Sequence, residues 1–179
     1  MRKWNGILSA VILVMFLVHG ILGGFQLIGA GNMISKVFAR VMLCLIAVHA
    51  VIGLILTART LKIQKKTGAA YFRQNRLFWA RRISGFLIMA LLFFHMTAFS
   101  DRSREVFRLV WFDRGKLVTQ LLLVLTVAVH VISNAKPMLI TFGIRSLRER
   151  AADILFALTV LLAFMAAAFI IYYLRWNGI

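Results

Sequence analysis

Four histidines are the residues of this chain whose type and spacing could support metal chemistry. They are the only histidines in 179 residues, and each lies within a different long apolar stretch: His19, His49, His95 and His130. An imidazole buried in hydrocarbon is costly unless a partner compensates it, and neutral imidazole is the commonest protein ligand for metals. A lone membrane histidine more often bonds a neighbouring helix. Four at matched depth instead predict two pairs of axial ligands for haem iron.

The stretches that carry the histidines are apolar enough to lie in a membrane. The chain is 62% hydrophobic and has a mean hydropathy of +0.90, which is too apolar for a water-soluble domain. A helix needs about 20 apolar residues to cross roughly 30 Å of hydrocarbon. The runs that approach this length are 7–31, 37–57, 83–99, 117–132 and 151–174. We expect an all-α integral membrane protein, with residues 1–179 forming one domain, a bundle of five transmembrane helices. The two short runs should extend into flanking residues.

Positive charge lies mainly between the apolar runs. The formal net charge is +17, which in a soluble protein would suggest a nucleic-acid partner. Here the positive-inside rule explains it better, because the larger share of the 22 basic residues falls on the side of the N-terminus. We therefore expect no nucleic-acid partner. We expect a multi-pass protein of the cell inner or cytoplasmic membrane, with the N-terminus cytoplasmic and the C-terminus outside.

This topology sorts the histidines into pairs. His19 and His95 lie on helices that run outward, whereas His49 and His130 lie on helices that run inward. At a rise of about 1.5 Å per residue, the first two reach one depth nearer the outside and the last two reach one depth nearer the cytoplasm. A haem iron needs both axial imidazoles at one depth on facing helices. Because the chain has no C-x-x-C-H motif, we expect two non-covalent haem b groups.

Cationic and hydroxyl residues near the helix ends are candidates to bind haem propionates, which need such partners at the membrane edge. They are Arg59, Arg82 and Ser84 on the cytoplasmic side and Lys36 and Arg40 on the outer side. For each of them, a solvated side chain that snorkels to the interface is the simpler alternative. The glycines beside His19 leave room either for a porphyrin or for a closely packed helix. These glycines are Gly20, Gly23 and Gly24.

One segment of the sequence resembles a known family. Arg82, Ser84 and Gly85, with nine residues between Gly85 and His95, resemble the R-x-[ST]-G-x9-H stretch of the dihaem cytochrome b membrane anchors of succinate dehydrogenase and fumarate reductase. The segment 130–134 is similar to the one that carries the family's last ligand. The order of five helices, with a histidine on each of the first four, also agrees. Only the segment from Arg82 to His95 is a specific motif.

The resemblance implies an electron-transfer subunit rather than an enzyme in its own right. It implies an outer, distal haem on His19 and His95 and an inner, proximal haem on His49 and His130. It also implies electron transfer between a quinone, such as menaquinone, and a cytoplasmic succinate dehydrogenase or fumarate reductase, made of a flavoprotein subunit and an iron–sulfur subunit. The sequence offers no catalytic acid, base or nucleophile. The sequence leaves open the direction of the electron transfer and whether the complex is a homo-oligomer.

The quinone site is expected near the outer haem, between the first helix and the loop after the third. A quinone needs an apolar pocket with a few converging hydrogen-bonding groups. Gln26 and Asp101 are the candidates there, and Ser133 and Asn134 on the inner side are the alternative. Some family members use a glutamate inside the membrane, but here all five acidic residues lie at or beyond the expected membrane edges. We therefore expect no proton path through a membrane glutamate.

Two other functions fit the same residues. A cytochrome b anchor of another respiratory dehydrogenase, such as a hydrogenase or a formate dehydrogenase, would use the histidines in the same way. A haem-free transporter or assembly protein would use them for proton relay or for helix packing. A visible absorption spectrum of the purified protein separates the haem-free class from the other two.

Overall fold

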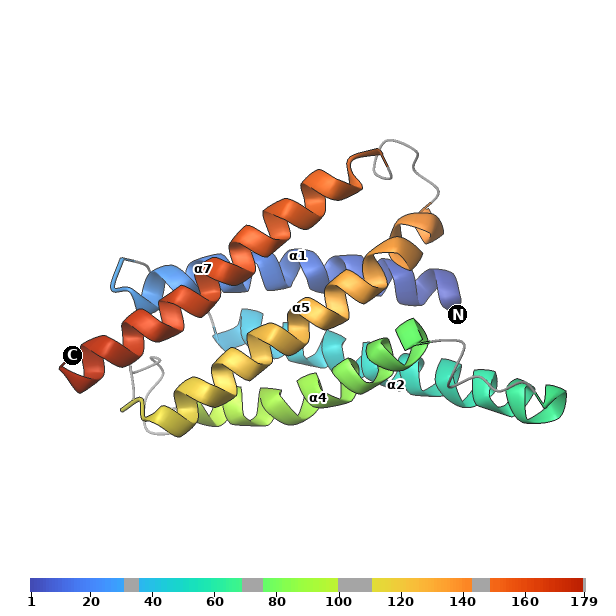
Figure 1. Ribbon diagram of the computed structural model, residues 1–179, viewed down its shortest axis with the longest axis horizontal. Coiled ribbons are helices and arrows are strands. Elements are labelled where there is room, and N and C mark those ends of the chain that lie inside the picture. Colours follow the sequence, from blue (N-terminus) through green and yellow to red (C-terminus); the bar gives the residue numbers. More distant parts are fainter. Residues whose placement is uncertain (31–35, 69–75, 100–110, 143–148, 179) are drawn as a thin grey trace.

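The structure is a computed structural model that describes residues 1–30, 36–68, 76–99, 111–142 and 149–178. Figure 1 shows long helices lying side by side. Their bounds are α1 Arg2–Leu27, α2 Lys36–Thr67, α4 Arg76–Phe99, α5 Arg114–Phe142 and α7 Ala151–Asn177. The described residues contain no strand. The two chain termini lie at opposite ends of the bundle (Figure 1), and we call these ends the N-side and the C-side.

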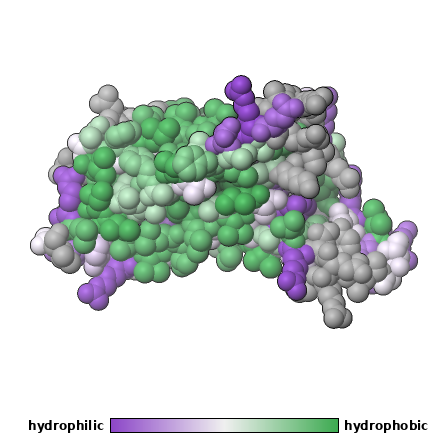
Figure 2. All heavy atoms as spheres, turned by 45° about the horizontal axis from the view of Figure 1, so that its top comes forward, coloured by the Kyte–Doolittle hydropathy of each residue, from purple (hydrophilic) through white to green (hydrophobic). Residues whose placement is uncertain are grey.

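All five helices are long and apolar enough to cross a membrane, so the chain is a multi-pass membrane protein. Figure 2 shows a broad hydrophobic surface with hydrophilic side chains towards its ends. Phe86 and Phe156 are 62% and 72% exposed, which a lipid environment explains and water does not. The prediction of an all-α protein with five spanning helices is confirmed. The two short apolar runs extend as expected, to Arg76–Phe99 and Arg114–Phe142.

The four tryptophans lie at the two ends of the bundle. Trp4 and Trp79 lie near the starts of α1 and α4, on the N-side. Trp111 and Trp176 lie on the C-side, where their ring centroids are 6.2 Å apart. Tryptophan is enriched at both membrane–water interfaces. The N-side and the C-side are therefore the two ends at which the bundle meets the lipid headgroups.

Helix α7 holds much of the core by packing against α1 and α5, while α4 packs along α5 and α1 packs along α2. Gly20 and Gly24 of α1 allow the close approach of α7. A Cβ atom at either position would overlap Met165 or Phe164, respectively. These contacts agree with the packing role predicted for the glycines beside His19, and the porphyrin role stays a prediction.

On the N-side, an arginine of α4 bonds a backbone carbonyl of α5 next to a proline in that helix. Pro137 lies inside α5 and has no N–H to donate to the carbonyl of Ser133, four residues earlier. Nε of Arg81 on α4 donates to that carbonyl instead, over 2.8 Å. The interruption in the α5 ladder is therefore satisfied by the neighbouring helix, three residues after His130.

Candidate metal centre

The structure brings the four histidines together in two pairs. The ring centroids of His19 on α1 and His95 on α4 are 5.9 Å apart. Those of His49 on α2 and His130 on α5 are 6.3 Å apart. The ring planes meet at 71° and 89°, so neither pair is a stacked aromatic contact. These are the two pairs that the depth of the histidines predicts.

The pairs lie at different depths in the bundle. The ring centroid of His95 is 5.3 Å from that of Phe99, the last residue of α4, which ends on the C-side. Nδ1 of His49 is 3.4 Å from Oγ of Ser9, which lies near the start of α1 on the N-side. We therefore call His19 and His95 the C-side pair, and His49 and His130 the N-side pair.

The spacing of each pair fits one iron between two imidazoles. With a metal–nitrogen distance of about 2 Å and each ring centre behind its nitrogen, the two centroids lie roughly 6 Å apart. The measured separations agree with this value. In the described part of the chain, the helices that share a pair, α1 with α4 and α2 with α5, are not closely packed. A porphyrin between paired histidines requires such a separation.

The number of ligands favours haem over a bare metal ion. Among the described residues, no group of three or more histidine, cysteine, aspartate or glutamate side chains could hold a metal. Structural zinc sites use four protein ligands, and catalytic ones use three with a water. Haem iron needs only axial ligands from the protein because the macrocycle supplies the others. Two imidazoles per site therefore suit haem.

Ser84 fixes the tautomer of His130. Its Oγ lies 3.0 Å from Nδ1 of His130 and donates its own hydrogen to the carbonyl of Arg81 over 3.2 Å. A hydroxyl group has only one hydrogen to donate. With the Ser84 hydrogen on that carbonyl, the hydroxyl oxygen accepts from Nδ1–H of His130, in the tautomer that leaves the Nε2 lone pair available to a metal.

Ser9 does the same for His49, the other member of the N-side pair. Its Oγ donates to the carbonyl of Asn5 over 2.7 Å and lies 3.4 Å from Nδ1 of His49. By the same count of hydrogens, His49 donates its Nδ1–H to Ser9. Both ligands of the N-side pair thus present Nε2 without a proton.

The C-side pair has a different partner. Oε1 of Gln120 on α5 is 2.7 Å from Nδ1 of His95. Because an amide oxygen only accepts, His95 donates its Nδ1–H to Gln120. Nδ1 of His19 is buried without a hydrogen-bond partner among the described residues. Histidines that ligate metals typically donate their other ring N–H to a fixed acceptor, and His49, His95 and His130 follow that pattern.

Two residues of the predicted motif lie against His130. Ser84 is 3% exposed and bonds the imidazole, and its predicted contact with a propionate stays a prediction. A Cβ atom at Gly85 would lie 3.4 Å from Cε1 of His130, an ordinary contact, so a side chain larger than alanine would crowd the ring. Ser84 and Gly85 of α4 therefore both contact the His130 ring of α5.

Arg82 reaches from α4 towards α2 on the N-side. Its Cζ lies 5.2 Å from the centre of the Phe78 ring, and its Nη1 lies 3.7 Å from where a Cβ of Gly53 would be. Its Nε is buried and has no partner within the described ranges. Arg82 thus retains a buried donor that an anionic group such as a propionate could use.

The other propionate candidates lie at the surface or beyond the described residues. Arg59 is exposed and its Nη1 is 3.2 Å from Sδ of Met1. Arg40 is also exposed, and the side chain of Lys36 lies outside the described residues. For Arg59 and Arg40, the exposure agrees with a snorkelling side chain.

The predicted quinone residues lie at both ends of the bundle. Gln26 is half-buried near the end of α1 on the C-side, and Asp101 lies outside the described residues. On the N-side, the side chains of Ser133 and Asn134 donate to the carbonyl of His130, over 3.1 Å and 2.7 Å. These two residues are therefore engaged with their own helix.

Sequence reasoning missed Ser9 and Gln120, which bond the ligands directly. Each is a polar residue inside an apolar run, and burying such a group is costly unless it is bonded. The polarity of Ser9 and Gln120 within apolar runs was therefore the sign in the sequence that each has a bonding partner. Their partners depend on how α1 and α5 are rotated, which the sequence does not state.

Comparisons with known proteins return no match. No protein-family model and no curated protein matches the sequence, and no solved structure matches the fold. The function is therefore argued from the two histidine pairs and their hydrogen-bond partners.

Proposed function

We propose that this chain is the membrane-anchor dihaem cytochrome b of a respiratory complex. It would transfer electrons between a quinone pool and a cytoplasmic enzyme of the succinate dehydrogenase or fumarate reductase class. The observation that most supports this function is the pair of imidazole sites, each with iron-like spacing and with Nδ1 of three rings bonded to fixed acceptors. Haem, when bound, would supply one-electron chemistry at its iron.

In this proposal the chain's own residues hold, orient and insulate the cofactor. The four histidines would hold the two haems through their imidazoles, and Ser9, Ser84 and Gln120 would fix the orientation of three rings and increase their electron-donor strength. Arg82 would bind a propionate on the N-side through its half-buried guanidinium, whose Nε is buried. The surrounding apolar helices exclude water and, with the axial ligands, set the redox potentials. Chemical conversion of the dicarboxylate belongs to the partner subunits.

The contacts of the motif support the family resemblance. Ser84 and Gly85 of the R-x-[ST]-G sequence both touch His130 on the neighbouring helix, one as a hydrogen-bond acceptor and one by leaving space. A hydroxyl residue followed by glycine therefore has a physical role at these positions, which is to position an axial ligand.

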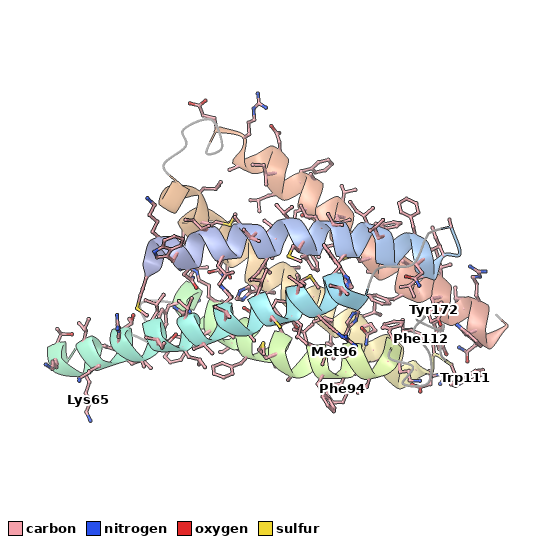
Figure 3. All side chains as sticks on the ribbon, turned by 180° about the vertical axis from the view of Figure 1, so that it is seen from behind. Lys65, Phe94, Met96, Trp111, Phe112 and Tyr172 are labelled. Carbon is pink, nitrogen blue, oxygen red and sulfur yellow. The ribbon has the colours of Figure 1, made fainter. Side chains whose placement is uncertain are left out.

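The partner subunits would dock on the N-side, which we place in the cytoplasm. Helix α2 has 32 residues, so it is about 48 Å long, compared with roughly 30 Å of hydrocarbon. Its last turns project beyond the neighbouring helices (Figures 1 and 3), and Lys65 lies there. Lys62, Lys65 and Lys66 are all exposed. We propose that this basic end of α2 meets the iron–sulfur subunit, with the flavoprotein bound behind it.

A quinone, such as menaquinone, would exchange electrons near the C-side pair. The side-chain donors of Ser133 and Asn134 are engaged with the carbonyl of His130, which favours Gln26 over the N-side alternative. Gln26→Leu should then lower quinone turnover while both haems are retained. Normal turnover in Gln26→Leu, with loss in Asn134→Leu at full haem content, would move the site to the N-side.

The test is to purify the complex from membranes through a tag on this chain. We expect a flavoprotein and an iron–sulfur subunit to copurify, a b-type absorption spectrum, and haem reduction when succinate is added or haem reoxidation when fumarate is added. Copurification with a hydrogenase or a formate dehydrogenase would assign the chain to another respiratory complex. A preparation with no haem absorption would contradict the proposal altogether.

A further inference from the structure

Gln120 is fully buried near the C-side start of α5. It is 0% exposed, and Ser84 is the other polar side chain that is buried among the described residues. An amide inside hydrocarbon costs free energy unless its oxygen and nitrogen are hydrogen-bonded. Its oxygen accepts from Nδ1 of His95 over 2.7 Å, and its nitrogen donates to Oγ1 of Thr119 over 3.4 Å. The shorter of the two bonds is therefore the one to the candidate iron ligand.

We propose that Gln120 is a positioning residue that sets the redox potential of the C-side haem through its bond to His95. This inference rests on the proposed function. A carbonyl-type oxygen is a stronger acceptor than a hydroxyl oxygen, and its bond to His95 is shorter than the 3.0 Å and 3.4 Å bonds of the N-side pair. Pulling on the Nδ1–H gives the ring partial imidazolate character, which stabilises ferric iron and lowers the potential.

The two histidines of the C-side pair also differ in the hydrogen bonding of Nδ1. His95 is bonded to Gln120, while Nδ1 of His19 has no partner in the part of the chain that the structure describes. The imidazole of His95 should therefore donate more electron density to iron than the imidazole of His19. Both rings of the N-side pair, by contrast, share the same weaker kind of acceptor, a serine hydroxyl. The potential of the C-side haem should therefore depend on a single side chain.

The alternative role for Gln120 is to hold α4 against α5 by an interhelical hydrogen bond. Redox titration of the purified complex separates the two roles, with the C-side haem identified as the one that is lost in His19→Leu. Gln120→Met removes the acceptor at nearly constant volume, and Gln120→Glu replaces it with a stronger acceptor. Thr126→Val is the matched control, because the Thr126 hydroxyl on the same helix bonds the carbonyl of Leu122.

We expect Gln120→Met to raise the potential of the C-side haem and to weaken its binding about 10- to 100-fold. We expect Gln120→Glu to lower that potential, and all three variants to leave the N-side haem unchanged. Unchanged potentials in both Gln120 variants, or shifts in the same direction in both, would overturn the inference and leave only the helix-holding role. An unaltered protein that carries no haem would overturn the proposed function itself.

Discussion

The N-side pair lies among hydroxyl and cationic side chains, whereas the C-side pair lies among aromatic rings and one buried amide. Ser9 and Ser84 bond the N-side imidazoles, and Arg82 reaches into the space between α4 and α2 with an unused donor. The ring of Phe99 contacts His95 on the C-side. Two histidine pairs of the same composition therefore differ in the polarity of their surroundings.

The aromatic side chains of the C-side form a packed cluster. The ring of Phe99 stacks on those of Phe112 and Phe169 with centroid distances of 5.8 Å and 6.1 Å, and Tyr172 lies 5.0 Å from Phe112. Phe112, Tyr172 and Trp111 lie together at this end in Figure 3. We therefore expect hydrogen bonds and charges to determine haem binding and redox potential at the N-side pair. At the C-side pair, we expect aromatic packing and the Gln120 amide to determine them.

The largest change in haem content should follow the replacement of a paired histidine. His95→Leu should remove the C-side haem and spare the N-side one, because the two pairs share no ligand. His49→Leu should do the reverse. Haem content per chain should halve in each variant, and the two remaining haems should differ in spectrum or potential. If His19 and His49 variants lost the same haem, the pairing would be wrong.

A side chain at position 85 should empty the N-side site by steric displacement. The Cβ of Gly85→Val would already lie 3.4 Å from Cε1 of His130, and its methyl groups would push the ring out of place. We expect loss of the N-side haem with the C-side haem retained, as measured by haem content and redox titration. Gly85→Ala is the control, because its Cβ alone would make an ordinary van der Waals contact with the ring and should leave the N-side haem in place. Retention of both haems in Gly85→Val would refute the contact.

Removing a serine hydroxyl should weaken haem binding without abolishing it. Ser84→Ala should raise the rate at which the N-side haem transfers to an excess of apomyoglobin, in line with an affinity loss of about 10- to 100-fold. Ser9→Ala should do so less, because its bond to His49 is 3.4 Å and that of Ser84 to His130 is 3.0 Å. Ser84→Thr, which keeps the hydroxyl, should bind haem normally. A larger effect at the C-side haem would contradict the comparison.

The smallest effect should come from the exposed end of α2. Glutamate at positions 62, 65 and 66 should weaken copurification of the iron–sulfur subunit, most clearly at low salt, because exposed charges are screened beyond about 10 Å at 0.1 M. Lys3→Glu, on the same side of the bundle, is the control and should not affect assembly. Copurification that stays normal at low salt would leave these lysines with a role in membrane topology alone.

The spanning helices and the histidine pairing follow from the sequence for a simple reason. Apolar length and the rise per residue are local properties, and they fix how deep His19 and His95 lie whatever the helix packing. The neighbours of each ring depend on helix rotation, so Ser9 and Gln120 were not predicted. The bond from Ser84 to His130 was not predicted either, because the face of α4 that meets α5 was not known.

Haem content is the most direct test of the two-site proposal. A pyridine haemochrome assay on the purified protein, divided by the chain concentration, should give two haem b per chain, all of it extractable by acid-acetone. A ratio near one would leave only one of the two histidine pairs occupied. No haem, or haem that stays attached to the polypeptide after extraction, would contradict the central claim.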